Sequence, residues 1–362
     1  MDSNPYGSIT DVAGVLVGQV ERIGAGWLTG VTAIIPPPGT LGAVDVRGGG
    51  PGTHETDALA PGTLADTVDA VTLAGGSSFG LVAAAGVQRW CEEQGRGVSI
   101  SSGVVVPIVP GAIVFDLGKG GDPRHRPDAG MGYDAAAAAT GGVVRTGCVG
   151  AGTGTTFGIP ALKGGIGTAS VHLDGGIVVG ALAVANAHGS PCVAGSGALY
   201  AAQLVADEQL RPRTPDPEEV AADVARRSAS AAAPVLDQLN TTLAVVATNA
   251  RLTHSQTHRM ASAGHDGLAR AIRPAHTLVD GDSVFALATG EVDPVAAVPA
   301  GAWPGAESIG GVLAVQAAAA DAVALAIVDA VLAATSVRTP AIDLPGYLDS
   351  FPSARPPAHP AR

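Results

Sequence analysis

The chain has 362 residues, of which 46% are hydrophobic, 14% are charged and only 3% are aromatic. This length allows one large domain or two ordinary ones, with a core built from Ala, Val, Leu and Ile in which glycines let backbones approach closely. The formal net charge of −12 argues against a nucleic-acid partner, because binding to a phosphate backbone requires clustered Lys and Arg.

Short β-branched runs between glycine turns predict the strands of buried sheets. In chain order they cover residues 31–35, 103–109, 177–184 and 243–247. Residues 1–18, which precede them, contain no basic stretch followed by an apolar one, so we expect no signal peptide.

Helices are predicted at residues 78–94, 134–139, 217–236, 254–270 and 310–335. The last of these is long enough to cross a bilayer, but Gln316, Asp321 and Asp329 interrupt it. Carboxylates inside a membrane are costly, so we expect a buried core helix and no membrane partner.

Strands alternating with long apolar helices indicate one α/β domain, residues 1–344, in which helices cover sheets. Residues 345–362 are rich in proline, and we expect them to form a disordered tail. Cys91, Cys148 and Cys192 are widely spaced, which suits neither a disulfide framework nor a thiolate metal site. This cysteine usage predicts a reducing cytoplasm.

Two kinds of glycine-rich loop invite a nucleotide-binding interpretation. The run GAGTG at 150–154 lacks the third glycine of the dinucleotide motif, since Thr155 stands in its place. A phosphate loop needs Ser or Thr after its lysine, yet Lys119 and Lys163 are each followed by glycine. Nucleotide binding is therefore not expected.

Three histidines, His254, His258 and His265, lie on one predicted helix. The first two have the spacing of a zinc-protease motif, but Ser255 replaces the required glutamate. We interpret all three as exposed helix residues, with a metallohydrolase as the alternative.

Ser78 occupies the centre of a Gly-x-Ser-x-Gly pattern, the nucleophile elbow of α/β-hydrolases. No acid and histidine further along the chain complete a triad, so the pattern is better explained as a helix N-terminus with close backbone packing.

The triplet Asn240-Thr241-Thr242 directly precedes the apolar run at 243–247. A hydroxyl is a poor nucleophile without a nearby base. A threonine at a chain's own N-terminus carries that base, because its α-amino group titrates at about 7.7–8.0. Cutting the Asn240–Thr241 bond would create such a threonine, with Thr241 Oγ attacking the preceding carbonyl. Without other support, the triplet is better explained as ordinary turn chemistry at a strand start.

The triplet belongs to a longer series of motifs that runs along the chain in order. They are ITDVAGV (9–15), VDVRGG (44–49), LAGGSSFGL (73–81), GAGTG (150–154), KGGIGTAS (163–170), ANA (185–187), NTT (240–242), ATNA (247–250), HT (276–277) and DGD (280–282). In these motifs the chain resembles the L-aminopeptidase/D-esterase family of self-processing hydrolases, peptidase family S58. This family also contains nylon-oligomer hydrolases and β-peptidyl aminopeptidases.

The resemblance implies a four-layer αββα sandwich of the N-terminal-nucleophile-hydrolase kind, with its own strand connectivity. It implies that Thr241 is the nucleophile and that Asn186 helps to bind the oxyanion, a contribution of about 3–4 kcal/mol for a single donor. Lys163 matches a lysine beside the nucleophile, and Asp280 and Asp282 match an acidic pair used in self-cutting. By turn preferences alone, four of these residues would be ordinary strand-end and turn residues, namely Asn186, Lys163, Asp280 and Asp282.

The chain departs from the family where a tyrosine is often found near the nucleophile, because Phe115 aligns there. Phenylalanine keeps the ring but has no hydroxyl, which puts substrate preference and turnover in doubt. Tyr133 is an alternative source of that hydroxyl.

We therefore expect a precursor that cuts itself into an α chain, 1–240, and a β chain, 241–362, without a cofactor or metal. The expected substrates are small peptides, amino-acid amides or esters, or amide oligomers, and Asp280 and Asp282 would attract a substrate ammonium. Family likeness predicts a homo-oligomer, such as a tetramer. An ornithine-acetyltransferase-like acyl transferase and a homologue that never cuts itself remain alternatives.

Overall fold

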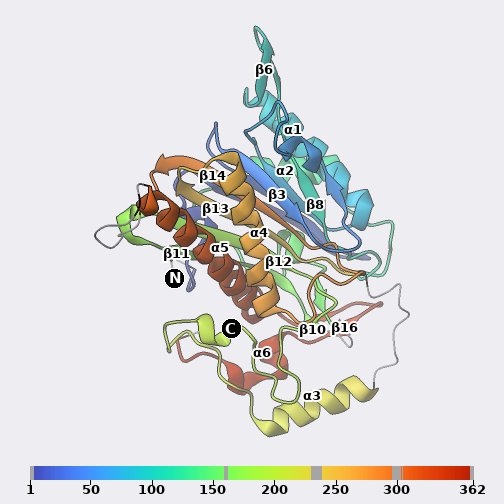
Figure 1. The fold of residues 1–362 in the computed structure, drawn as a ribbon. Helices are drawn as coiled ribbons and strands as arrows, with labels where there is room; N and C mark the ends of the chain where they lie inside the picture. The colour runs from blue at the N-terminus through green and yellow to red at the C-terminus, as the bar shows by residue number, and fades with distance from the viewer. Residues whose placement is uncertain (1–3, 159–161, 230–238, 296–302, 304, 359–362) are drawn as a thin grey trace.

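Two five-stranded sheets lie at the centre of the computed structural model, which describes residues 4–158, 162–229, 239–295, 303 and 305–358 (Figure 1). The first sheet has the order β1-β2-β5-β8-β4 and the second β11-β12-β13-β14-β3. The strands of the first sheet are β1 (Leu16–Gly24), β2 (Trp27–Ile35), β4 (Thr53–His54), β5 (Val71–Ala74) and β8 (Gly111–Ile113). Those of the second are β3 (Leu41–Val46), β11 (Gly165–His172), β12 (Val178–Ala185), β13 (Leu243–Ala250) and β14 (Ser283–Val292).

The remaining elements are six α-helices, three two-stranded ribbons and several 3-10 turns within the described residues. The helices are α1 (Ala83–Glu93), α2 (Ala129–Ala137), α3 (Pro217–Ala229), α4 (His254–Ala271), α5 (Ala306–Ala333) and α6 (Tyr347–Ser350). The ribbons pair β6 (Val98–Ser101) with β7 (Val104–Val106), β9 (Thr156–Phe157) with β10 (Leu162–Lys163), and β15 (Val337–Arg338) with β16 (Asp343–Leu344).

Three hydrophobic clusters separate four layers of secondary structure. The first joins α1 and α2 to the outer face of the first sheet, as Val87 and Met131 pack with Val31. The second fills the space between the sheets, where Ile34 of β2 faces the same cluster as Val245 of β13. The third lies under α4 and α5 on the second sheet. The predicted αββα sandwich is thereby confirmed.

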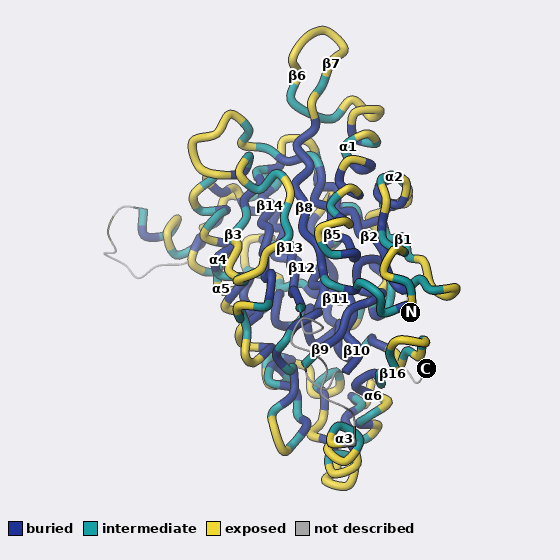
Figure 2. Tube along the Cα trace, turned by 90° about the vertical axis from the view of Figure 1, so that its right-hand side faces the viewer, coloured by how far each residue is buried: buried dark blue, intermediate teal, exposed yellow. Residues whose placement is uncertain are grey.

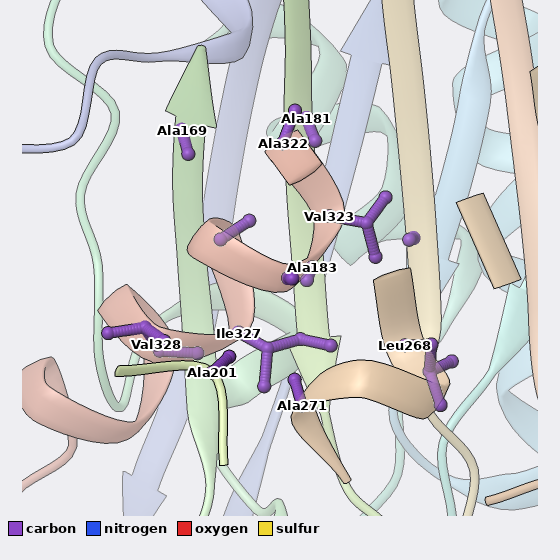
Figure 3. Close-up of a cluster of buried hydrophobic side chains, with 14 of the residues drawn as sticks. Ala169, Ala181, Ala183, Ala201, Leu268, Ala271, Ala322, Val323, Ile327 and Val328 are labelled. Atoms are coloured by element: carbon purple, nitrogen blue, oxygen red, sulfur yellow. The ribbon is translucent and has the colours of Figure 1, made fainter. Parts of the chain in front are cut away.

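The interface between α5 and the second sheet is made largely of alanine and valine (Figure 3). Ala322 and Ile327 of α5 lie over Ala181 and Ala183 of β12. A Cβ added at Gly167 of β11 would lie 2.2 Å from the carbonyl oxygen of Ala326, so the backbones touch. Such close packing explains how a chain with few aromatic residues fills its core.

Most of the predicted helices form, with shifted ends. The predicted helix at 78–94 is divided into a 3-10 segment, Ser77–Val82, and α1. Helix α4 begins after Thr253, whose side chain accepts from the backbone N–H of Gln256 in a capping box. The predicted helix at 217–236 corresponds to α3, and residues 230–236 lie outside the described residues.

Helix α5 passes the length and hydropathy test for a membrane span, and it lies in the core as predicted. Its Asp329 is 2% exposed and accepts from the backbone N–H of Thr168 at 2.9 Å. Burial raises the pKa of Asp329 to about 7. The carboxyl group is therefore mainly neutral only below about pH 7, because burial penalises its charged form.

Three predictions about exposure were wrong. Residues 104–106 form a strand, but it belongs to a projecting, exposed ribbon that turns at Gly103, φ 77°, and not to a buried sheet (Figure 2). His265 is fully buried, since α4 turns it toward the Asp45 carbonyl oxygen, 2.8 Å from its Nε2. Burial lowers its pKa to about 4.

The tail is the third correction, because residues 345–358 are packed. Tyr347 and Phe351 are 0% and 1% exposed, and the Tyr347 hydroxyl donates to the Gly197 carbonyl at 3.0 Å. The backbone N–H of Lys163 donates to the carbonyl of Pro345 at 2.8 Å. Aromatic burial outweighs the proline content here, and residues 359–362 lie outside the described residues.

Candidate active site

The connectivity of the second sheet brings the predicted site residues together. Strand β12 is antiparallel to β13, so its last residues pair with the first residues of β13, as Val184 does with Leu243. Strand β14 is parallel to β13, so Ser283 pairs with the same Leu243. Asn186 follows β12, Thr241 precedes β13 and Asp282 precedes β14, and all three therefore meet at one end of the sheet.

The peptide bond between Asn240 and Thr241 is held beside the Thr241 hydroxyl. Thr241 is 2% exposed, and its Oγ1 lies 2.5 Å from the carbonyl oxygen of Asn240. The backbone N–H of Gly281 donates to the same oxygen at 3.1 Å. A donor on this oxygen withdraws electrons from the carbonyl carbon and binds the negative charge that would develop if Oγ1 attacked it.

Asp282 fixes the start of the strand that carries the hydroxyl. Its Oδ1 accepts from the backbone N–H of Thr242 at 2.8 Å. Its Oδ2 accepts from the backbone N–H of His276 at 2.9 Å and lies 2.8 Å from the Nδ1 of that histidine. His276 itself has a positive φ of 56°. Asp282 thus connects β13 to the loop that precedes β14.

Asp280 connects the same loop to the end of β12. Its Oδ1 accepts from the backbone N–H of His188 at 3.0 Å, and its Oδ2 accepts from the N–H and the hydroxyl of Thr277 at 3.1 and 2.5 Å. Burial raises the pKa of Asp280, with repulsion from Asp282 adding to it, while these hydrogen bonds oppose the shift.

The two carboxylates build the site and do not face an incoming substrate. Asp280 is 0% exposed and Asp282 is 1% exposed. Each receives three hydrogen bonds from the chain. Attraction of a substrate ammonium by this pair, which the sequence suggested, has no support in this geometry.

Asn186 presents a side-chain amide beside Thr241. Its backbone carbonyl accepts from the N–H of Thr241 at 2.6 Å, and its Oδ1 accepts from the N–H of Thr156 at 2.9 Å. Its Nδ2 is buried and has no hydrogen-bond partner among the described residues. A buried, unpaired N–H donor is costly unless a ligand or reaction intermediate uses it.

The side chain of Lys163 is hydrogen-bonded to the neighbouring backbone. Its side chain is fully buried, and its Nζ donates to the carbonyl oxygens of Gly164 at 2.8 Å and Gly152 at 3.1 Å. The hydrogen bonds of the described residues include none from it to Thr241 or Asn186. Burial lowers the pKa of Lys163, and the nearby Cys148 thiol opposes that shift.

Lys119, which the sequence did not single out as a site residue, reaches Asn186 instead. Its Nζ lies 2.8 Å from the hydroxyl of Thr156 and 3.4 Å from the Oδ1 of Asn186. Burial lowers the pKa of Lys119 to about 7, with Asp116 opposing the shift. The composition could have drawn attention to Lys119, because Lys119 and Lys163 are the only two lysines of the chain.

The hydroxyl that Phe115 lacks is not replaced by Tyr133. Tyr133 lies in α2, and its hydroxyl donates to the Glu93 carboxylate at 2.6 Å. The guanidinium of Arg89 lies over its ring at 4.2 Å. Phe115 is half-buried and precedes Asp116, which accepts from the backbone N–H of Gly76 at 2.6 Å.

A cavity of about 280 Å³ opens next to His188, two residues beyond Asn186. Its wall combines apolar side chains, including Phe157 and Phe351, with the guanidinium groups of Arg227 and Arg273. Its volume suits a small ligand.

The cavity wall carries a positive charge excess. On the wall, the Asp223 carboxylate pairs with the guanidinium of Arg227 at 2.6 Å. Arg273 adds a second cation to the wall, and its guanidinium stacks over the ring of Tyr200 at 4.5 Å. Such a wall favours a ligand with a negative charge.

Comparison with known proteins shows the family of this chain. The model of peptidase family S58 matches residues 7–342. An uncharacterized aminopeptidase of Mycobacterium tuberculosis is 51% identical over 355 residues, with 96% of this chain and 98% of the relative covered. A 6-aminohexanoate-oligomer endohydrolase of Agromyces sp. is 31% identical over 270 residues, with 73% and 70% covered.

Solved structures show the same fold. The L-aminopeptidase D-Ala-esterase/amidase of Ochrobactrum anthropi, described as a variant of the Ntn hydrolase fold, aligns with a TM-score of 0.70 at 23% identity. The alignment covers 97% of this chain and 93% of that one. A β-aminopeptidase of Burkholderia sp. aligns with a TM-score of 0.68 at 24% identity, covering 98% and 95%.

Proposed function

The chain belongs to peptidase family S58, and on this premise we propose that it cuts its own backbone between Asn240 and Thr241 and then uses Thr241 as its nucleophile. It is a hydrolase of peptide or linear amide bonds, as its relatives indicate. The assignment of roles to individual residues rests on the site geometry.

The observation that carries the proposal is the arrangement around the Asn240 carbonyl. Thr241 Oγ1 lies 2.5 Å from its oxygen, and the Gly281 N–H donates to that oxygen. Attack by Oγ1 on the carbonyl carbon forms a C–O bond, and the C–N bond then breaks as the hydroxyl proton passes to the Thr241 nitrogen. Water hydrolyses the resulting ester, leaving a carboxylate on Asn240 and a free hydroxyl and amine on Thr241.

In turnover the freed amine of Thr241 takes the proton from its own hydroxyl, because an N-terminal amine titrates at about 7.7–8.0. Oγ1 attacks the carbonyl carbon of the substrate amide, and the Nδ2 of Asn186 donates to the developing oxyanion. The leaving amine takes a proton, and water then releases the acyl group from Thr241.

For the substrate, we propose a short amide with a free carboxylate. The cavity beside His188 is small, and Arg227 and Arg273 lie on its wall. One relative is named for hydrolysis of 6-aminohexanoate oligomers, which are amides of an amino acid. A short amide substrate with a free carboxylate is expected to have a lower KM than the same amide with that carboxylate as a methyl ester. Arg273→Gln is expected to remove this difference in KM.

We also propose that the processed units form a homo-oligomer in the cytoplasm. The projecting ribbon of β6 and β7 exposes apolar side chains, with Ile100 63% and Val104 49% exposed. A two-stranded ribbon is marginal in water by itself, so packing against a second copy would stabilise it. Light scattering at several concentrations measures the assembly, and a monomer at all of them contradicts it.

The intact mass of the purified protein under denaturing conditions tests the self-cut. Scaling the 35.4 kDa chain by length gives fragments of about 24 kDa for residues 1–240 and about 12 kDa for residues 241–362. Two such fragments, absent from Thr241→Ala, would support the nucleophile. One uncut chain after long incubation would refute both the base and the nucleophile.

A further inference from the structure

The chain contains only two lysines, and both lie near the site: Lys163 is fully buried and Lys119 is half-buried. Lys119 and Lys163 are the only lysines among 20 basic residues, so arginine provides the other cations. Lysine is ordinarily a surface residue. Arginine is always charged and has a planar fork, whereas lysine is compact and changes its protonation state readily when buried. A chain that otherwise uses arginine has kept lysine where a small or titratable amine is useful.

The loop that carries Lys119 is fixed at both ends. The Lys119 N–H donates to the Asp116 carbonyl at 3.2 Å, and Gly118 has a positive φ of 74° that closes the turn. The Thr339 hydroxyl, from the segment between β15 and β16, donates to the Lys119 carbonyl at 2.6 Å. The backbone of Lys119 is therefore held in place, and its side chain extends to Thr156 and Asn186.

The amide of Asn186 can take two orientations, which exchange its oxygen and nitrogen. The orientation in the structure points Oδ1 at two donors, the Thr156 N–H at 2.9 Å and the Lys119 ammonium at 3.4 Å. Exchange of the two atoms would place an NH₂ group against an N–H and an ammonium. Lys119 therefore disfavours the exchanged orientation and leaves Nδ2 as the unpaired donor.

We propose that Lys119 is a positioning residue for hydrolysis, whose ammonium fixes the Asn186 amide with Nδ2 directed to the oxyanion. This role rests on the proposed function, since it requires Asn186 to bind the oxyanion. The ammonium also polarises the amide and so strengthens its N–H donors. The self-cut uses the Gly281 N–H on the Asn240 oxygen instead, so it does not depend on Lys119.

The charged groups around Lys119 determine how its role changes with pH. Asp116 stabilises the ammonium, while burial and the second cation, Lys163, destabilise it. These effects place the pKa of Lys119 at about 7. The ammonium is therefore lost as pH rises through neutrality, and kcat should decline on the alkaline side for this reason. Replacing Lys119 with a side chain that cannot titrate should remove that decline.

Lys119→Met is the first variant, and Arg124→Gln is its control. Arg124 is a cation of the same loop, with an 86% exposed side chain that pairs with Asp122. Both variants are expected to cut themselves like the wild type. Lys119→Met is expected to lose about 10- to 100-fold in kcat, the loss typical when a residue that orients a functional side chain is removed. Its KM should change much less, and its alkaline decline should disappear.

Thr156→Val and Thr156→Ser form a second pair if Lys119→Met does not fold. Valine removes the hydroxyl that binds the Lys119 ammonium and keeps the shape and the backbone N–H. Thr156→Val should therefore lose more kcat than Thr156→Ser.

Three results have distinct meanings. A kcat of Lys119→Met within twofold of wild type would overturn the positioning role, as would loss of self-cutting in this variant alone. An uncut, inactive wild-type protein would instead refute the proposed function.

Discussion

Gly281→Ala should displace the Thr241 hydroxyl from the bond that it cuts and so slow the self-cut. A Cβ at this position would lie 2.6 Å from Thr241 Oγ1 and 2.8 Å from the carbonyl oxygen of Gly50. Alanine keeps the backbone N–H that donates to Asn240, so only the methyl group is new. The backbone oxygen of Gly50 blocks retreat in one direction, so the Thr241 hydroxyl has to move.

The size of the effect follows from these distances. Ordinary contact begins at 3.4 Å, so the hydroxyl must shift by about 0.8 Å. A misplacement of about 1 Å costs about 10²-fold in rate, and self-cutting should slow by about that factor. Overpacking should also lower the free energy of unfolding by about 1–3 kcal/mol.

Intact mass followed over time gives the half-life of the uncut chain. Gly142→Ala is the matched control, because the nearest atom to a Cβ there is the Thr140 hydroxyl oxygen at 3.9 Å. It should cut at the wild-type rate. If Gly281→Ala also cuts at that rate, the position of the hydroxyl does not control the self-cut, and the reasoning from this geometry fails.

Three further changes test other parts of the structure. Asn186→Ala should lower kcat by about 10²- to 10³-fold while the self-cut remains, measured by amide hydrolysis and intact mass; equal kcat would exclude it as oxyanion donor. Asp329 has a folded pKa of about 7 against 3.8 in the unfolded chain. The neutral carboxyl contributes its full share of the free energy of unfolding below about pH 4, and this share is lost as pH rises to about 7. The change is about 4 kcal/mol at most. Urea unfolding should therefore show Asp329→Asn gaining stability relative to wild type across this pH range. If the difference in free energy of unfolding between Asp329→Asn and wild type does not change with pH, the pKa of Asp329 is not raised by burial. Truncation after Leu344 removes the buried rings of Tyr347 and Phe351, and it should lower the free energy of unfolding by about 3 kcal/mol or more; an unchanged urea midpoint would show that the segment does not stabilise the core.

The layers could be predicted from the sequence, whereas the pairing of strands could not. Local signals suffice for α4, where the Thr253 capping box sets its first residue, and for the apolar run that forms β13. One of the two strands that pair with β14 is β3, from the first part of the chain, and no local sequence pattern specifies that contact. The tail shows the opposite error: its proline content suggested disorder, but Tyr347 and Phe351 bury their rings against distant segments.

The sheet connectivity brings together three of the site residues that were found from motifs. Thr241, Asn186 and Asp282 each lie at a strand end, where short motifs are easy to recognise. Of the residues that bind Asp280, His188 comes from a loop position that no motif singled out. The acidic pair was expected to face the substrate, but only the structure shows that backbone N–H groups occupy its oxygens.

Lys119 illustrates why composition can reveal what motifs conceal. A motif search does not select Lys119, because Gly120 follows it where a phosphate loop needs Ser or Thr. As one of two lysines in a chain rich in arginine, it is unusual by composition alone. Removing an ammonium from water is costly, so a chain that places both of its lysines near one end of a sheet, Lys163 fully buried and Lys119 half-buried, has a local use for them. The scarcity of a residue type is a signal that motif searches do not read, and Lys119→Met tests it directly.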